Sequence, residues 1–344
     1  MSNQSTKYSI LFVGDLTPFS RSSQRRDALL RLGTEVEGVS WSSDAPPRFL
    51  EKVFSKLRIP LDRVDTNNRI RALVQAKKFD VIWVEKGNII WPKTLRFVKK
   101  VLPGAKLISL SEDDMYARHN QSYFYRWGLG SYDWVFTTKK YNLSELKQIG
   151  AKQTELFLDA YDETLHRPVV LNERERILYG CDVGFIGTFE EDRAQSMLFL
   201  AENGIKVSIW GNGWGTWKKK HTNLIVKDSA IYGREYVKAI CATKINLCFL
   251  RKINRDEVTS RSVEIPACGA FMLGERTERH KEFFNERSEA EFFGSDRELL
   301  DKARYYLEHE EERGRIALAG KKRCESSGYG MEKQLQEVLL KIFS

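Results

Sequence analysis

Cysteine is scarce in this sequence, and its spacing suggests neither a covalent nor a metal framework. Five cysteines are spread over 344 residues, and none forms a Cys-x-x-Cys pair. The five histidines likewise lack a His-x-x-x-His spacing. Disulfide scaffolds and zinc sites depend on such paired spacings. We therefore expect buried free thiols and no metal site.

Long apolar runs are absent as well. No run approaches the roughly 18 to 20 residues that a membrane-spanning helix needs, and the first seven residues lack the apolar core of a secretory signal. The chain also has no internal repeat and no low-complexity segment. Hydrophobic content of 42% and charged content of 30% are typical of a soluble globular protein. We expect a cytoplasmic protein whose length predicts two domains.

The net positive charge is concentrated in the first half of the chain. Residues 1–165 contain 26 Lys and Arg against 19 Asp and Glu, whereas residues 166–344 contain 30 against 28. Lysines scattered over solvated helix faces explain such an excess, and so does an anionic partner. No nucleic-acid-binding signature occurs. We therefore do not expect a nucleic-acid partner. Our hypothesis is that the basic N-terminal half makes peripheral contact with a membrane.

Apolar runs alternate with amphipathic helical patterns, which predicts an α/β fold in two series. The first series opens with the run 8–14, which ends at Gly14, and Asp15 begins the loop that follows. No G-x-G-x-x-G motif follows, so the dinucleotide fingerprint is absent. A polar linker is expected at 159–174, before the second series. Open α/β sheets bind ligands at the carboxyl ends of their strands, so the loops there are the candidate sites.

Three consecutive acids, Glu112, Asp113 and Asp114, follow the apolar run 106–110. They fit a site at the end of a strand. They also fit a helix N-terminus, where carboxylates are favoured by the helix dipole.

Two loops rich in small residues follow strands of the second series. Gly187 and Thr188 end the first strand, and Arg193 lies in the helix behind them. Gly211 and Asn212 begin the loop after the next strand. Small residues at such junctions allow backbone N–H groups to approach a phosphate.

The stretch 250–273 combines a charged loop with a helix that starts near Ser260. Asp256 in the loop and Glu264 in the helix are suited to hold two hydroxyl groups of one ligand. Basic side chains and the helix N-terminus favour phosphate; the basic residues are Arg251, Lys252, Arg255 and Arg261. A sugar nucleotide fits this combination. The alternative is an ordinary helix acid, paired with an arginine, beside a solvated loop.

Most of the chain from Tyr8 onward resembles the CgeB-like (spore maturation protein) glycosyltransferases of the GT-B superfamily. The segments that carry the resemblance are Asp133-Trp-Val-Phe-Thr-Thr-Lys139, Asp182-Val-Gly-Phe-Ile-Gly-Thr188 and, most specifically, Thr259-Ser-Arg-Ser-Val-Glu-Ile-Pro-Ala-Cys-Gly-Ala-Phe271. The resemblance implies a GT-B architecture, in which two Rossmann-like α/β domains face each other across a cleft. It places an acceptor domain at 1–165, a nucleotide-sugar domain at 175–325, and a C-terminal helix at 326–344 that packs back towards the first domain.

The resemblance also implies roles for particular residues. Related retaining enzymes carry Glu-x7-Glu, in which the second acid holds the ribose and the first approaches the donor sugar. Glu264 matches the second acid, and the shorter Asp256 stands at the first. Asp256, Asp113 and Asp114 are the predicted catalytic residues, and Gly14 and Asp15 lie on the predicted acceptor side. The predicted donor-binding residues are Gly187, Thr188, Arg193, Gly211, Asn212, Arg251, Arg261 and Glu264.

The function expected from these observations is transfer of a sugar from a nucleotide-diphosphate sugar to a glycan, a lipid-linked molecule or a protein. The nucleotide sugar is a co-substrate, and no cofactor or metal is expected. The resemblance implies a retaining reaction. Two alternatives stay open: a non-catalytic coat or surface assembly protein, and a sugar-nucleotide epimerase. Such epimerases rely on acids and a histidine, and we expect no histidine near the donor loops except His221.

Overall fold

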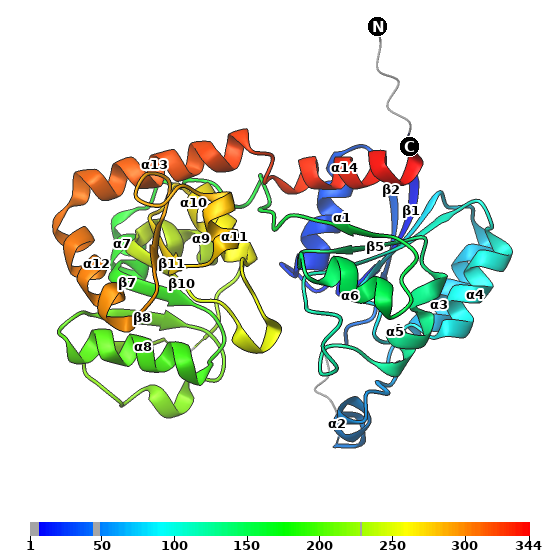
Figure 1. Cartoon of the computed structure of the whole chain (residues 1–344), viewed down its shortest axis with the longest axis horizontal. Helices are drawn as coiled ribbons and strands as arrows, with labels where there is room; N and C mark the ends of the chain where they lie inside the picture. The colour runs from blue at the N-terminus through cyan, green and yellow to red at the C-terminus, as the bar shows by residue number, and fades with distance from the viewer. Residues whose placement is uncertain (1–6, 44–48, 228) are drawn as a thin grey trace, which may run out of the picture. The chain divides into compact units, whose positions relative to one another are not determined.

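The computed structural model describes residues 7–43, 49–227 and 229–344 (Figure 1). The chain divides into two compact units, one made of residues 1–158 and 331–344 and the other of residues 159–330. The first boundary lies before the predicted domain end at residue 165. Among the described helices, none has both the length and the apolar character that a bilayer crossing requires.

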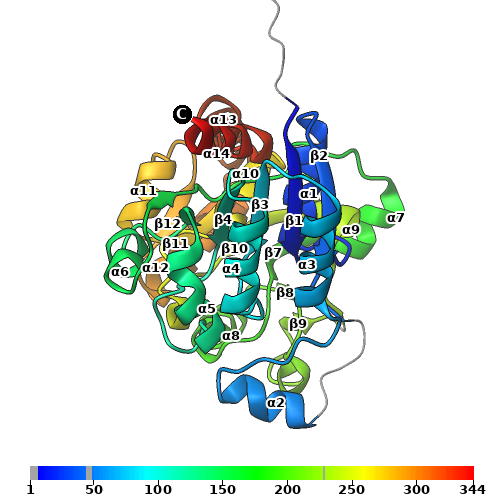
Figure 2. The ribbon, with the colours of Figure 1, turned by 90° about the vertical axis from the view of Figure 1, so that its right-hand side faces the viewer.

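The first unit is a six-stranded parallel sheet in the order β2-β1-β3-β4-β5-β6, with helices on both faces (Figure 2). Its elements are β1 (Ser9–Gly14), α1 (Arg21–Arg31), β2 (Glu35–Ser40), α2 (Phe49–Lys56), α3 (Thr66–Ala76), β3 (Val81–Glu85), α4 (Pro92–Val101), β4 (Lys106–Ser111), α5 (Tyr123–Gly128), η1 (Leu129–Ser131), β5 (Trp134–Thr137), α6 (Asn142–Gln148), β6 (Thr154–Leu156) and α14 (Met331–Phe343). The central strands are near-continuous apolar runs because both of their faces are buried.

The C-terminal helix α14 belongs to the first unit and packs against α1. Tyr8 and Phe343 stack with ring centroids 4.3 Å apart, and Arg31 forms an ion pair with Glu332. The backbone N–H of Leu158 donates to the side chain of Gln334. Residues 159–330 are thus inserted between the last helix of the first unit and the rest of it.

The second unit is also a six-stranded parallel sheet, in the order β12-β11-β10-β7-β8-β9. Its elements are α7 (Glu173–Tyr179), β7 (Cys181–Ile186), α8 (Glu191–Glu202), β8 (Val207–Trp210), η2 (Gly215–Trp217), β9 (Leu224–Val226), α9 (Gly233–Ala242), β10 (Thr243–Cys248), η3 (Lys252–Asn254), α10 (Ser260–Ala267), β11 (Met272–Glu275), α11 (Glu278–Phe283), β12 (Glu291–Phe293), α12 (Asp296–Glu308) and α13 (Glu310–Ser326). The two parallel α/β sheets confirm the predicted fold class.

The prediction of a polar linker at 159–174 is partly wrong. Asp159, Asp162 and His166 are buried. Tyr161 forms a β-bridge with Gly330 and donates its backbone N–H to the carbonyl of Tyr329 at 3.0 Å. The segment is therefore packed against its own unit, although its composition is polar.

We predict opposite effects for two glycine substitutions in α13. A Cβ at Gly320 would lie 2.3 Å from the carbonyl oxygen of Glu289, whereas a Cβ at Gly314 has no neighbour within 4 Å. Gly320→Ala should destabilise the protein by about 2 kcal/mol through overpacking. Gly314→Ala should stabilise it by roughly 0.5 to 1 kcal/mol through helix propensity. Urea unfolding followed by circular dichroism measures both; equal effects of the two substitutions would contradict this packing of α13.

Candidate functional site

The second sheet has a topological switch point between β7 and β10, where the order of strands reverses. Crossover helices leave such a point towards opposite faces of the sheet, so a crevice opens at the carboxyl ends of the two strands. The loops that begin at Gly187 and at Phe249 follow these two strands. The predicted donor residues are carried by these loops, by the neighbouring loop after β8, and by helices α8 and α10.

The two glycine loops lie directly beside each other. Ile186 pairs with Trp210 in register, so Gly187 and Gly211 are neighbours. A Cβ at Gly211 would lie 1.9 Å from the carbonyl oxygen of Gly187, so only glycine fits there. The indole N–H of Trp214 donates to the same oxygen at 2.8 Å.

The side chains next to these glycines, Thr188 and Asn212, are exposed. Phe189 donates its backbone N–H to the carbonyl of Asn212 at 2.9 Å, which ties the two loops together. The structure thus brings four of the predicted donor residues to one edge of the sheet.

A cavity of about 440 Å³ lies between 188–193 and 250–253. Two of the basic residues expected to bind phosphate are paired there with acids from the start of α8. Arg251 lies 2.8 Å from Glu190, and Lys252 lies 2.8 Å from Asp192. Both basic side chains are more than half exposed, and pairs of this kind contribute little to stability.

Arg193 has a different position from Arg251. It is buried, its guanidinium lies 2.6 Å from the carboxylate of Glu190, and it lies over the ring of Phe185. It therefore supports the loop after β7 through its contacts with Glu190 and Phe185.

Asp256 organises its own loop. Its Oδ1 accepts a hydrogen bond from the side-chain amide of Asn254 at 2.7 Å, and its backbone N–H donates to the carbonyl of Arg251 at 3.2 Å. Arg255, between Asn254 and Asp256, has a left-handed backbone with φ of 48°. This conformation costs energy in a non-glycine residue. The carboxylate of Asp256 thus holds the loop in shape, a role that its spacing from Glu264 did not indicate.

Glu264 on α10 is 5% exposed and is held by two aromatic side chains. The hydroxyl of Tyr236 donates to Oε2 of Glu264 at 2.6 Å. Burial and the nearby carboxylate raise the pKa of Tyr236 well above its ordinary value, so the hydroxyl keeps its proton.

His166 was missed as a site residue. Its Nε2 lies 3.8 Å from Oε1 of Glu264, and its Nδ1 accepts the backbone N–H of Asp162 at 2.9 Å. The accepting Nδ1 places the ring proton on Nε2, which faces Glu264. The expectation that no histidine except His221 lies near the donor loops is therefore wrong. The polar composition around His166 indicated a linker, and no local pattern revealed that the chain folds back onto α10.

A second buried histidine supports the start of α10. The Nδ1 of His280 lies 2.6 Å from the carbonyl of Glu275, and its Nε2 lies 2.7 Å from the hydroxyl of Ser262. Burial lowers the pKa of His280 to about 4, so the ring is neutral at pH 7. It donates to the carbonyl and accepts from Ser262, while Ser262 accepts the backbone N–H of Thr259.

Arg261 lies one turn before Glu264 on the same helix. Its Nε is buried and has no hydrogen-bond partner among the residues that the structure describes. Within the same residues, no carboxylate forms an ion pair with it. A buried N–H group without a partner is uncommon because it costs desolvation free energy. Arg193 also has a buried Nε without a hydrogen-bond partner among these residues, but its guanidinium is paired with Glu190. Of the predicted cations, Arg261 is therefore the best suited to an anionic ligand.

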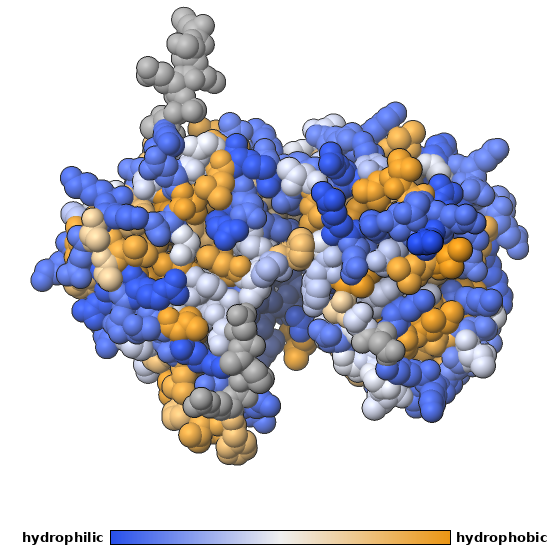
Figure 3. Space-filling view, turned by 180° about the vertical axis from the view of Figure 1, so that it is seen from behind, coloured by the Kyte–Doolittle hydropathy of each residue, from blue (hydrophilic) through white to orange (hydrophobic). Residues whose placement is uncertain are grey.

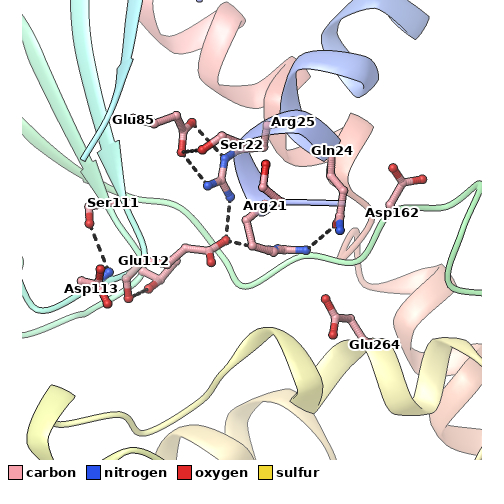
Figure 4. Close-up of polar contacts among 12 residues, drawn as sticks. Arg21, Ser22, Gln24, Arg25, Glu85, Ser111, Glu112, Asp113, Asp162 and Glu264 are labelled. Atoms are coloured by element: carbon pink, nitrogen blue, oxygen red, sulfur yellow. Dashed lines mark hydrogen bonds and ion pairs between the residues drawn. The ribbon is translucent and has the colours of Figure 1, made fainter. Parts of the chain in front are cut away.

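The first unit carries an ion-pair network at the carboxyl edge of its sheet (Figure 4). Arg25 of α1 is 3% exposed and binds Glu85, at the end of β3, through two nitrogens at 2.9 and 2.5 Å. A third nitrogen of Arg25 donates to Glu112 at 2.6 Å, and Arg21 donates to the same oxygen at 3.1 Å. Burial opposes the charge of Glu112, but the two arginines outweigh it and lower the pKa of Glu112 to about 2.

The three acids after β4 therefore divide into different environments. Asp113 is partly exposed and lies 2.6 Å from Lys86. Asp114 is fully buried, and its carboxylate accepts hydrogen bonds from the side chain of Asn142 and from the backbone N–H groups of Tyr116 and Ala117. Asp114 thus has a structural position, and Asp113 is the acid placed to meet a ligand.

Gly14 and Asp15 shape the end of β1. A Cβ at Gly14 would lie 2.9 Å from the Cβ of Ser22 and 3.0 Å from the Cγ of Glu85, so the ion-pair network leaves no room for a side chain. Oδ1 of Asp15 accepts the backbone N–H and the hydroxyl of Thr17. No cluster of three or more possible metal ligands occurs in the described ranges.

Comparison with known proteins gives one family match and many matches to solved structures. Residues 193–339 match the family model described as glycosyl transferase-like. No curated protein sequence gives a significant match.

Three solved structures illustrate the structural likeness. Sucrose-phosphate synthase from Thermosynechococcus elongatus matches with a TM-score of 0.66 at 11% identity, over 98% of this chain and 99% of that one. Anabaena HepE in complex with UDP and glucose gives 0.64 at 12%, over 98% and 100%. An alpha-glucosyltransferase in complex with UDP and a 13-mer DNA gives 0.66 at 13%, over 98% and 100%. At these identities the likeness shows the fold alone, and it confirms the GT-B fold.

The low pKa of Glu112 predicts a pH-dependent stability difference. Its folded pKa is lowered from 4.5 to about 2. The contribution of the carboxylate is therefore complete above pH 4.5 and is lost as the pH falls towards 2. Glu112→Gln should lower the free energy of unfolding by on the order of 2 kcal/mol at pH 6, and the deficit should shrink as the pH approaches 2. Urea unfolding at several pH values measures it.

Glu37→Gln is the control, because Glu37 forms only an exposed pair with Lys77 in the same unit. A deficit for Glu112→Gln that does not change with pH would contradict the network as described.

Proposed function

We propose that this protein is a glycosyltransferase that binds a nucleotide-diphosphate sugar at the carboxyl edge of the second sheet. The observation that carries the proposal is the position of Arg261 and Glu264, one turn apart on α10. One is a cation whose buried Nε lacks a partner in the described structure, and the other is a carboxylate held in place by Tyr236. A phosphate and a sugar hydroxyl are the groups that these two side chains recognise. The glycosyl transferase-like match includes both residues.

The diphosphate is assigned to Arg261, the start of α10 and the loop at Gly187. Arg261 supplies charge, and a helix N-terminus supplies backbone N–H groups and a favourable dipole. Thr188 adds a hydroxyl beside the switch point. Arg251 takes a secondary part, because its guanidinium is already paired with Glu190. When the bond from the sugar to the diphosphate breaks, these groups stabilise the charge on the leaving group, so the reaction needs no metal ion.

The ribose is assigned to Glu264. The hydrogen bond from Tyr236 and the neighbouring Nε2 of His166 fix the direction of its carboxylate before a ligand binds. A carboxylate fixed in this way loses little entropy when a ligand binds. It can accept directional hydrogen bonds from the two hydroxyl groups of a ribose. Retention at the sugar carbon is proposed from the resemblance to retaining enzymes with Glu-x7-Glu.

The acceptor is assigned to the carboxyl edge of the first sheet. Asp113 with Lys86, and the nearby Glu112 with Arg21, place both signs of charge there. Such a surface suits the hydroxyl groups of a glycan or of a lipid-linked or protein acceptor. In this proposal Asp15 shapes the neighbouring loop.

A second candidate is a sugar-nucleotide epimerase, and the position of His166 favours it. A histidine and a carboxylate 3.8 Å apart are a pair that moves protons in many enzymes. An epimerase would convert the nucleotide sugar with no acceptor present. Product analysis of the nucleotide sugar, incubated with the protein alone, separates the two functions.

We predict that Arg261→Met weakens binding of nucleoside diphosphates by roughly 10- to 100-fold, because a charge-assisted contact with phosphate is lost. Calorimetry with UDP, GDP, TDP and CMP, with and without magnesium, measures it. Arg297→Met is the matched control, because Arg297 is an exposed residue of α12 paired with Asp301 in its own helix. Binding by the parent that Arg261→Met leaves unchanged would contradict the phosphate assignment. No binding to any nucleotide would favour the assembly-protein alternative.

We predict that Glu264→Gln removes discrimination for the ribose hydroxyls. The parent should bind the preferred nucleoside diphosphate at least roughly tenfold more tightly than its 2′,3′-dideoxy analogue, because a buried polar group is left unpaired by the analogue. The variant should bind the two with nearly equal affinity. Tyr236→Phe keeps the carboxylate and should retain part of the discrimination. Equal discrimination by the parent and Glu264→Gln would remove Glu264 from the ribose site.

A further inference from the structure

The first unit exposes a group of large apolar side chains that the proposed donor and acceptor sites do not use. We call it the apolar patch. Its members are Phe49, Leu50, Val53, Phe54, Leu57, Ile59, Leu61 and Trp127. Phe49 is 78% exposed and Trp127 is 67% exposed, and α2 has no buried residue. Figure 3 shows hydrophobic side chains gathered at the end of this unit where α2 lies.

The apolar patch is held in place by specific contacts. Arg63 pairs with Glu51 at 3.2 Å, which ties the loop after α2 to the helix. The Nε of Arg58 donates to the carbonyl of Gln121 at 2.9 Å, and the N–H of Tyr123 donates back to the carbonyl of Arg58 at 2.9 Å. These bonds connect the loop to α5, which carries Trp127.

An apolar cavity of about 610 Å³ continues the surface from this loop to α5. Ile59, Leu61 and Trp127 line it together with Trp91, and Lys93 stands at its edge with its ammonium 4.4 Å from the Trp91 ring. Contiguous exposed apolar surface of this kind marks a site of interaction.

The charge around the apolar patch is positive. Residues 49–63 contain four Lys and Arg against two Asp and Glu. Both acids are engaged, since Glu51 pairs with Arg63 and Asp62 accepts the N–H groups that open α3. Lys52 and Lys56 on α2 are exposed and form no ion pair with any described residue. Lys93 and Arg96 border the cavity.

We propose that the apolar patch inserts into the boundary between headgroups and acyl chains of an anionic membrane, with Lys52, Lys56 and Lys93 at the level of the phosphates. A short helix with bulky apolar residues and flanking lysines binds membranes in this way, and each part strengthens the other. A second copy of the chain is a poorer occupant, because an isologous contact would bring the same unpaired lysines of both copies together. Trp127 at the edge of the apolar patch suits the interface between membrane and water, because its ring is apolar and its N–H can donate a hydrogen bond.

This inference goes beyond the proposed transfer reaction and does not depend on it. Membrane binding by the apolar patch requires neither a nucleotide sugar nor an acceptor. A protein that binds vesicles without binding any nucleotide would keep this inference and remove the proposed function, and the reverse result would separate them equally well.

The test is flotation of the whole protein with vesicles of phosphatidylcholine containing about 30% phosphatidylserine, an anionic lipid. The parent should float with these vesicles and much less with phosphatidylcholine alone. Leu50→Glu/Leu57→Glu should weaken partitioning roughly tenfold or more, because two inserted apolar side chains become charged. Lys52→Gln/Lys56→Gln should abolish most of the preference for the anionic vesicles.

Val170→Glu/Ile177→Glu is the matched control, since both residues are strongly exposed apolar side chains of the second unit. All variants change exposed side chains, and each should keep the parental melting temperature. A parent that stays at the bottom of the gradient would overturn the proposal. So would a Leu50→Glu/Leu57→Glu protein that floats like the parent, or a parental dimer in ultracentrifugation that this variant converts to monomers.

Discussion

Both units depend on the same constraint, which is that a parallel sheet must cover both of its faces. Apolar strands such as β1 and β3 cannot face water, so each crossover places a helix on one face or the other. The helices then occupy the faces, and only the edges of the sheet at the strand ends remain for polar groups. The polar groups of the proposed donor and acceptor sites lie at carboxyl edges for this reason.

The charged side chains at those edges are stabilised by neighbouring groups, which differ between the two units. In the first unit, burial opposes the charge of Arg25, but Glu85 and Glu112 outweigh it and raise the pKa of the guanidinium further. In the second unit, Glu264 is buried against the hydroxyl of Tyr236 and the imidazole of His166. The first arrangement is rigid and self-neutralising. The second leaves a nearby cation, Arg261, whose Nε has no protein acceptor among the described residues, which is why the proposed phosphate site is assigned to it.

The sequence was sufficient for the features that depend on local pattern. Alternating strands and helices predicted two parallel α/β units, and the glycines at 187 and 211 predicted two adjacent loops at one edge. Glu264 was singled out by its spacing from Asp256 and by the segment that follows it, and its contact with a ligand stays a prediction. What the pattern could not reveal is pairing across the sequence. His166 reaches Glu264 over 98 positions, and Arg251 meets Glu190 over 61. Asp113 and Asp114 are neighbours of the same type, yet only the fold decides that one is buried on Asn142 and the other is not.

The place of α14 has a consequence for synthesis. Because this helix packs on α1 while the whole second unit lies between them in the sequence, the first unit is incomplete until residue 343 has left the ribosome. The second unit has no such dependence, because its last strand ends at Phe293 and its last helix at Ser326, before α14 begins. Although its residues emerge later than β1, it is the part of the chain that can finish folding first. A truncation or a bulky fusion at the C-terminus would therefore damage the surface beside β1, which lies more than 300 residues away in the sequence.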